Sequence, residues 1–292
     1  MNGKISNEEW LVFERPAIGT DQQQIGKVEI AYKVEADEKT GQKQIIPISD
    51  SNLFVFFATE KETHLGFLVQ GPYRTTPSRD NIPKDDEWNI KLVEETAILL
   101  RESLTKLREM NLLTVNALEA MPLNRVQFSK DHMFHPFFAS VRDALASEAL
   151  IPRYKGDFVS GKNAKIANSA DLRQLLGPSQ LEFFYEAKSP LNWVSDEISE
   201  YKTRELREYL MKELGVEEFT SQTLASKFTE RFIANQSDEW LIDFYRYLLD
   251  QRALWSTGGT LRKKPFIRLE DGAHASPFDD QDRPNAFLPL SK

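Results

Sequence analysis

The sequence contains no cysteine among its 292 residues. This absence excludes disulfide bonds, a thiolate nucleophile and zinc sites built on sulfur ligands. It is typical of proteins that work in the reducing cytosol, so we expect a cytoplasmic location.

Long apolar runs are also missing. No segment reaches the roughly 18–20 consecutive apolar residues that a membrane-spanning helix needs. The start of the chain, MNGKISNEEW, lacks the apolar core of a signal peptide. We therefore expect no membrane partner. A strand-like segment follows this start almost at once, which leaves open that the chain is a piece of a longer protein.

Histidine is scarce, with four residues in the chain. His132 and His135 could share a helix face, but aromatic residues surround them and no third ligand is evident, which argues against a metal site. The nucleophile pattern G-x-S-x-G is absent, and helical carboxylates are mostly solvated. We therefore predict no complete active site and no bound cofactor in this chain.

The charge balance is moderately acidic, with 45 Asp and Glu residues against 37 Lys and Arg residues and a net charge of −8. This balance argues against a general binder of nucleic acid or of anionic membranes. Hydrophobic residues make up 40% of the chain, which is enough for substantial cores. Because the length exceeds the usual size of one domain, we predict two, over residues 1–148 and 149–292.

The first domain is predicted to begin with a β-rich part. Its apolar patterning indicates strands over residues 9–14, 27–34, 44–48, 53–58 and 65–70. The runs 53–57 and 65–69 are so uniformly apolar that we expect both to be buried. A helix over residues 88–110, capped by Asp85 or Asp86, carries one apolar stripe that must lie on this sheet. Strands followed by a covering helix predict an α+β fold.

The remainder of the chain is predicted to be mostly helical. Helices are expected over residues 133–147, 179–185, 203–214, 220–235 and 237–253. Ser179 and Glu182 form a capping box for the second of these, and Gly215 ends the third. Residues 112–125 read either as a short helix or as a strand. Hairpins are expected over residues 149–160 and 265–288, and their likeness indicates either a repeated module or a coincidence of turn chemistry.

Between the last strand and the long helix lies a loop, residues 71–83, that carries Arg74 and Arg79. Its prolines stop regular structure, because proline fixes its own φ and pushes the residue before it out of the helical region. A rigid loop that presents arginines from the end of a buried strand is typical of an anion site. The same arginines can instead pair with nearby aspartates, as surface arginines often do.

Two further segments have the appearance of phosphate sites. Residues 156–163, GDFVSGKN, fit the pattern G-x-x-x-x-G-K, but Asn163 stands where a Ser or Thr should follow the lysine, and Phe158 and Val159 are too bulky for a cradle. A hairpin turn at residues 155–157 explains this segment better. Residues 255–264 combine a glycine pair with a basic cluster, which indicates a helix end and a flexible connection more than an anion nest.

The arginine loop also carries a family resemblance. Residues 56–83, FFATEKETHLGFLVQGPYRTTPSRDNIP, resemble the segment just downstream of the ATPase domain in bacterial relatives of sacsin, which are heat-shock-90-type (GHKL) ATPases. Residues 133–176, MFHPFFASVRDALASEALIPRYKGDFVSGKNAKIANSADLRQLL, are similar to the helix, hairpin and short helix that follow in that family. The resemblance covers roughly residues 50–176.

This resemblance implies a function for the chain. The chain would be the middle or transducer segment, with a small sheet covered by helices and a helical part behind it. The motifs by which that family binds Mg-ATP are absent, so the ATPase domain would precede this segment in a longer parent protein. In the family the transducer supplies a basic residue to the γ-phosphate, and Arg79, or Arg74, is the residue expected to do so here. A client or partner protein would respond to the nucleotide state.

Two other functions stay open from the residues alone. The chain could be a stand-alone interaction or scaffold module that uses its helical part, residues 196–255, to hold a protein partner. It could also be a nucleotide-dependent enzyme that uses Lys162.

Overall fold

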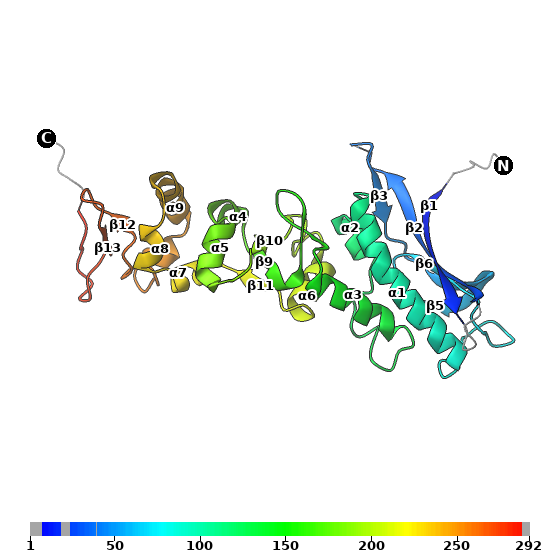
Figure 1. Cartoon of the computed structure of the whole chain (residues 1–292). Coiled ribbons are helices and arrows are strands. Elements are labelled where there is room, and N and C mark those ends of the chain that lie inside the picture. Colours follow the sequence, from blue (N-terminus) through cyan, green and yellow to red (C-terminus); the bar gives the residue numbers. More distant parts are fainter. Residues whose placement is uncertain (1–7, 19–23, 39, 288–292) are drawn as a thin grey trace, which may run out of the picture. The chain divides into compact units, whose positions relative to one another are not determined.

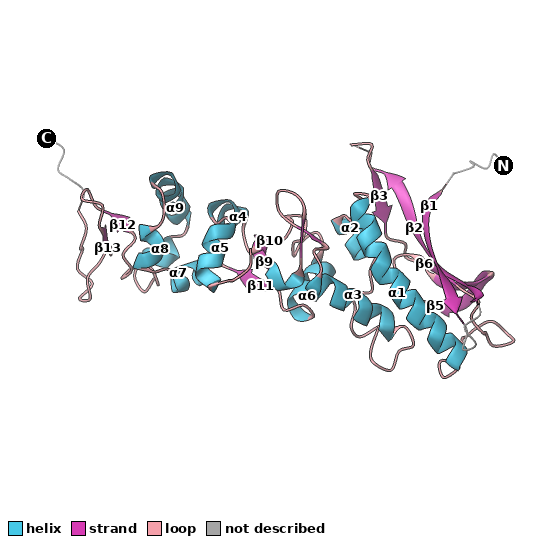
Figure 2. Cartoon of the chain, in the orientation of Figure 1, coloured by secondary structure: helices cyan, strands magenta, loops and turns pink. Residues whose placement is uncertain are grey.

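The computed structural model describes residues 8–18, 24–38 and 40–287 (Figure 1). The fold is mixed α+β, as the sequence predicts: an N-terminal sheet is followed by a mostly helical part with small sheets (Figure 2). The chain forms two compact units. The first holds Met1–Lys162 and Ser195–Gly215, and the second holds Asn163–Val194 and Val216–Lys292.

The first unit is built on a six-stranded sheet. Its strands are β1 (Glu9–Ile18), β2 (Gln24–Ala36), β3 (Lys43–Ile46), β4 (Asn52–Val55), β5 (Phe57–Glu62) and β6 (Leu68–Gln70). They lie in the order β1-β2-β6-β4-β5, with β3 beside β2, and only the β4–β6 pair is parallel. Buried Val28, Ile30 and Tyr32 alternate along β2 with residues that solvent reaches, so one face of the sheet forms the core.

Helix α1 (Glu87–Glu109) covers this inner face (Figure 1). Its apolar side chains recur every three or four positions, so they form a single buried stripe. Asp86 caps the helix by accepting a hydrogen bond from the backbone N–H of Asn89. Within the core, the hydroxyls of Tyr32 and Ser103 lie 2.8 Å apart and satisfy each other. The helix predicted over residues 88–110 and its cap at Asp86 are confirmed.

Smaller elements complete the first unit. They are α2 (Val115–Glu119), α3 (His135–Ser147), α6 (Arg204–Lys212) and the hairpin of β7 (Ile151–Pro152) with β8 (Phe158–Val159). Helix α3 packs against α1 and buries Phe137, Phe138 and Val141. Residues 112–125, which the sequence left undecided, contain a helix. Among the helices in the described part of the chain, none is long and apolar enough to cross a bilayer.

The second unit contains a small parallel sheet with helices around it. Its strands lie in the order β10 (Asn192–Trp193), β9 (Ala164–Ala167) and β11 (Glu217–Phe219). Its helices are α4 (Ala170–Leu175), α5 (Pro178–Tyr185), α7 (Ser221–Lys227), α8 (Glu230–Ala234), α9 (Asp238–Asp250) and α10 (Arg252–Trp255), and strands β12 (Ile267–Arg268) and β13 (His274–Ala275) pair near the end. Aromatic rings build its core, with Phe232 in contact with Phe184, Phe228 and Trp240.

The strand predicted over residues 53–58 is wrong. Strand β4 ends at Val55, Phe56 adopts a left-handed φ of 59°, and β5 begins at Phe57. Leu53 and Val55 are buried, whereas the side chains of Phe56 and Phe57 are 80% and 77% exposed. The apolar run therefore contains a tight turn that places its last two aromatic residues in solvent.

The two C-terminal helices are each shorter than predicted. The helix expected over residues 220–235 is interrupted because Phe228 is extended and Thr229 caps a new helix through its bond from the Phe232 N–H. The helix expected over residues 237–253 ends at Asp250, and α10 follows after Gln251.

The capping box predicted at Ser179 and Glu182 is also wrong. Helix α5 begins at Pro178, so Gly177 takes the N-cap position and the Gln180 side chain accepts a bond from the Gly177 N–H at 3.0 Å. Proline favours the first helical position because it has no N–H to satisfy there. The helix therefore begins at Pro178, one residue nearer the N-terminus than predicted.

Candidate functional site

The loop from Gly71 to Asp86 is held firmly between β6 and α1. The side chain of Asn89, buried in the first turn of α1, accepts a hydrogen bond from the Arg74 N–H and donates to the carbonyls of Arg74 and Pro83. The Trp88 indole donates to the Pro72 carbonyl at 2.8 Å. Sequence reasoning missed Asn89, although its place three residues after the capping Asp86 is a detectable signal.

Arg74 pairs with a nearby aspartate, the second of the two possibilities that the sequence leaves open for this arginine. Its Nη1 lies 3.2 Å from an Asp86 carboxylate oxygen, and its guanidinium lies 5.2 Å from the centroid of the Trp88 ring. The side chain is 63% exposed, so this pair contributes little to stability. Hydrogen bonds from the Asn89 N–H and from Arg74 lower the pKa of Asp86, so this carboxylate stays ionised beside Arg74.

Arg79 behaves differently from Arg74. Its Nη2 donates to the carbonyl oxygens of Val55 and Phe57, at 2.9 and 3.1 Å. In the described part of the chain it makes no ion pair with a carboxylate, so the expected pairing with an aspartate is not found for this residue. The neighbouring Asp80 instead accepts from the hydroxyls of Thr76 and Ser78, which lower its pKa.

The turn between β4 and β5 belongs to the same site. The two carbonyls that bind Arg79 flank Phe56, so the guanidinium braces the turn that exposes Phe56 and Phe57. Arg79 itself has a left-handed φ of 60°, and its carbonyl accepts from the Glu60 N–H at 3.1 Å. A non-glycine residue with positive φ costs free energy that its surroundings must offset. Such residues are found more often at functional sites than elsewhere. Sequence reasoning missed this turn, since no glycine, asparagine or proline marks it.

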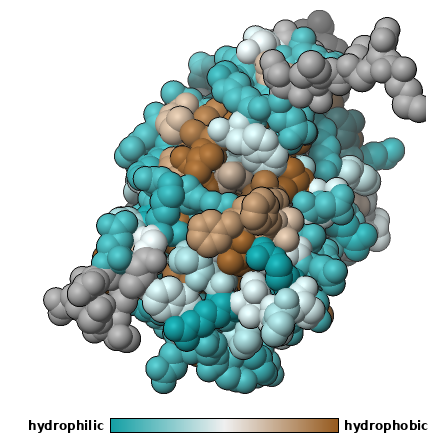
Figure 3. All heavy atoms as spheres, turned by 90° about the vertical axis from the view of Figure 1, so that its right-hand side faces the viewer, coloured by the Kyte–Doolittle hydropathy of each residue, from teal (hydrophilic) through white to brown (hydrophobic). Residues whose placement is uncertain are grey.

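The sheet face opposite α1 is also partly apolar. Val12, Ala31 and Leu68 lie side by side on β1, β2 and β6, out of phase with the buried residues of these strands. Figure 3 views the first unit from this side and shows apolar side chains gathered in the middle of a polar surround.

The segment that resembles a phosphate loop does not form one. Lys155, Gly156 and Asp157 all have positive φ and make the turn between β7 and β8, as the sequence predicts. Gly161 lies against the backbone of α3, where an added Cβ would come within 3.2 Å of Ala146 Cα. Lys162 lies in a short 3₁₀ turn that leads into a strand, so no helix N-terminus is available for a phosphate there.

The basic cluster over residues 255–264 and the pair of His132 and His135 both have partners within the fold. The Lys264 ammonium donates to the carbonyls of Ser226 and Phe228, and burial lowers its pKa. His135 Nδ1 lies 2.8 Å from the Phe128 carbonyl, and His132 Nδ1 accepts from the Phe134 N–H. The described residues include no group of three or more potential metal ligands.

Comparison with protein-family models, curated proteins and solved structures finds no match to this chain. The resemblance to sacsin-like ATPases therefore stays a prediction. The site itself consists of a firmly held loop, an arginine bonded to neutral carbonyls and an exposed aromatic turn. Such a site has a cation to offer, while the carboxylates of the loop are already engaged, Asp80 by the hydroxyls of Thr76 and Ser78 and Asp86 by Arg74.

Proposed function

We propose that the chain is the middle segment of a sacsin-like, heat-shock-90-type ATPase. In this function the chain is not catalytic alone. It supplies Arg79 to Mg-ATP held by a preceding domain of a longer parent protein, and it couples the nucleotide state to binding of a client or partner protein. A cytoplasmic location fits this role. The observation that carries the proposal is that the Arg79 guanidinium binds two carbonyl oxygens and no carboxylate of the described residues.

This bonding pattern suits an arginine that changes partner. A carboxylate would neutralise the guanidinium and would compete directly with phosphate, whereas neutral carbonyls hold its position without cancelling its charge. Charge on the phosphoryl oxygens is stabilised in the transition state by a positioned cation. Arg74 is less suited to this role because it already pairs with Asp86 and stacks on Trp88.

The proposal makes a simple prediction for the isolated chain. Because the motifs that hold Mg-ATP in the family are absent from this sequence, titration calorimetry should detect no micromolar binding of ATP and no hydrolysis should be measurable. Micromolar ATP binding to the isolated chain would contradict the proposal.

The role of Arg79 is tested in a protein that joins this chain to its ATPase domain. Arg79→Ala should lower the turnover of ATP on the order of a hundredfold while the affinity for ATP stays nearly unchanged, because the cation acts mainly on the transition state. Arg74→Ala is the matched control and should have a much smaller effect on turnover. An unchanged turnover in Arg79→Ala would remove this residue from the mechanism.

One observation favours the second candidate, a stand-alone interaction module. The second unit has an apolar groove of about 390 Å³ lined by α9, α10 and the segment around Phe278. The polar atoms of its aromatic rings are engaged with backbone groups: the Trp255 indole donates to the Leu248 carbonyl and the Tyr245 hydroxyl donates to the Phe266 carbonyl. An open reading frame that begins at this chain, with no ATPase domain encoded upstream, would favour this candidate over the first.

A further inference from the structure

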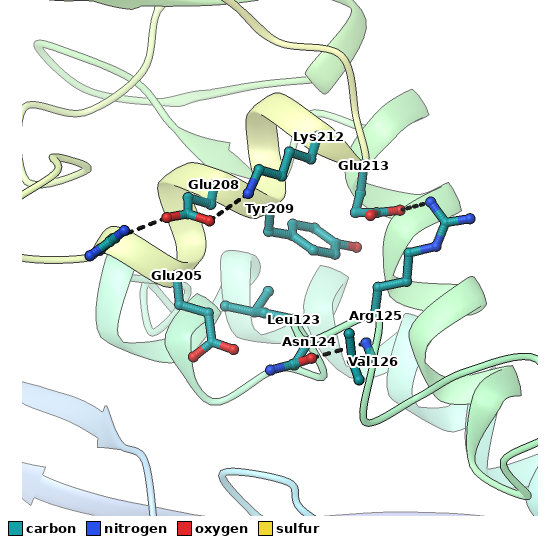
Figure 4. Close-up of a pocket in the computed structure, with 10 residues that line it drawn as sticks. Leu123, Asn124, Arg125, Val126, Glu205, Glu208, Tyr209, Lys212 and Glu213 are labelled. Atoms are coloured by element: carbon teal, nitrogen blue, oxygen red, sulfur yellow. Dashed lines mark hydrogen bonds and ion pairs between the residues drawn. The ribbon is translucent and has the colours of Figure 1, made fainter.

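A cleft in the first unit lies between α6 and the loop that follows α2. Its volume is about 440 Å³, and Figure 4 shows the side chains that line it. Leu123 and Val126 of the loop supply apolar surface, and Glu205, Tyr209 and Lys212 face it from α6. The α6 residues share a side of the cleft because they are spaced three and four positions apart along one helix.

The cations of the cleft already have partners. Glu208 accepts from Arg204 at 2.9 Å and from Lys212 at 2.7 Å, which makes a ladder along α6. Arg125 lies 3.5 Å from a Glu213 carboxylate oxygen across the other end of the cleft. These pairs leave little positive charge to attract an anion.

The acidic side of the cleft is not neutralised. Among the described residues, Glu205 makes no ion pair, and neither does Glu119 of the adjacent helix α2. Partial burial, and then the charge of Glu205, raise the pKa of Glu119, which is the response of a carboxyl group that lacks a cation nearby. The uncompensated charge at the end of the cleft that holds Glu205 is therefore negative.

A buried hydrogen-bond donor also lacks a partner. The Tyr209 side chain is 3% exposed, and its hydroxyl has no hydrogen-bond partner in the structure. Figure 4 shows the ring lying across the cleft with its hydroxyl directed toward the end that Arg125 and Glu213 close. Buried hydroxyls are nearly always hydrogen-bonded, so the Tyr209 hydroxyl is available to a partner from outside the chain, either a water molecule or a polar group of a ligand. Arg125 is 70% exposed and weakly paired, so it can move aside.

We propose that this cleft binds a polypeptide segment that presents a lysine or arginine side chain. The cationic head pairs with Glu205, the aliphatic stem lies along the apolar loop surface at Leu123 and Val126, and a backbone carbonyl of the segment accepts from the Tyr209 hydroxyl. The stem and head of a long basic side chain match an apolar floor with an acidic rim. A bare metal ion fits less well, since the described residues include no cluster of three ligands here.

The inference is independent of nucleotide chemistry and is tested on the chain alone. The probes are three short peptides of identical apolar flanks whose central residue is lysine, norleucine or glutamate. Binding is followed by methyl NMR shifts of Leu123 and Val126, which also report the place of binding. The lysine peptide should bind about two- to fivefold more tightly than the norleucine peptide, because an ion pair with the exposed Glu205 is gained, and the glutamate peptide should bind most weakly.

Two variants assign the contacts. Glu205→Gln should abolish the preference for lysine over norleucine, and the matched control Glu94→Gln, an exposed carboxylate on α1, should leave it unchanged. Tyr209→Phe should weaken the lysine and norleucine peptides by a similar factor of roughly two to ten, since it removes the carbonyl contact that both share. Equal binding of the three peptides, no saturable shift at Leu123 and Val126, or a lysine preference that survives Glu205→Gln would each overturn the proposal.

Discussion

Phe56 shows how one residue can carry both strain and exposure. Its φ of 59° is a conformation that costs a residue with a Cβ roughly 1–2 kcal/mol, and its side chain buries almost nothing that would offset this cost. The hydrogen bonds from Arg79 to the flanking carbonyls hold the turn in place. The aromatic pair is thus presented by the bonds from Arg79 and not by an intrinsic preference of the turn.

We expect Phe56→Asn to raise the free energy of unfolding by about 1 kcal/mol. Asparagine tolerates the left-handed region, and an exposed phenylalanine has no core contacts to lose. The matched control is Phe57→Asn, which lies next to it with similar exposure but without a positive φ, and which should give no gain. Urea unfolding measures both variants, and a Phe56→Asn chain no more stable than wild type would contradict the strain.

At the level of elements, an ion-pair network joins the edge strand of the sheet to its covering helix. Arg15 of β1 lies 2.7 Å from Glu95 and 2.8 Å from Glu102, both on α1, and Lys91 lies 3.2 Å from Glu95. Burial raises the pKa of Glu95, but the bonds from Arg15 and Lys91 outweigh it and lower the pKa below the usual 4.5. The ionised carboxylate is therefore favoured by the folded state.

This network predicts a pH dependence. Since the pKa of Glu95 is lower in the folded chain than in the unfolded chain, its contribution is fully present above the unfolded pKa and is lost as the pH falls through the folded value. The free energy of unfolding should fall from about pH 5 downward, and Glu95→Gln should make that fall shallower. Urea unfolding across this range measures the slope, with the exposed Glu94→Gln as control. An identical slope in wild type and Glu95→Gln would show that the network is not linked to folding.

The same scale shows what sequence patterns can and cannot predict. The long helix and its aspartate cap follow from an apolar stripe and a local capping rule, so both were predictable. The turn at Phe56 was not, because its conformation is held by Arg79 from a distant part of the chain and no turn-forming residue stands there. For the same reason the arginine loop could be located from its prolines, but the difference between Arg74 and Arg79 needed the carbonyls of β4 and β5. The cleft depends on a loop and a helix almost 80 residues apart, and no local pattern joins them.

At the scale of the whole molecule, each unit has a core of its own. Leu100 is fully buried in the first unit beneath the sheet, and Phe232 is fully buried among the aromatic rings of the second. Substantial cores of this kind are what allow compact units to unfold as separate cooperative transitions.

We therefore expect scanning calorimetry to resolve two transitions. Leu100→Ala removes buried methyl groups from the first core and should cost that unit about 2–5 kcal/mol, lowering one transition by several degrees and leaving the other in place. Phe232→Leu, a substitution in the second core, should lower the temperature of the other transition. A single transition that both variants lower equally would mean that the two units unfold as one, against the expectation from their separate cores.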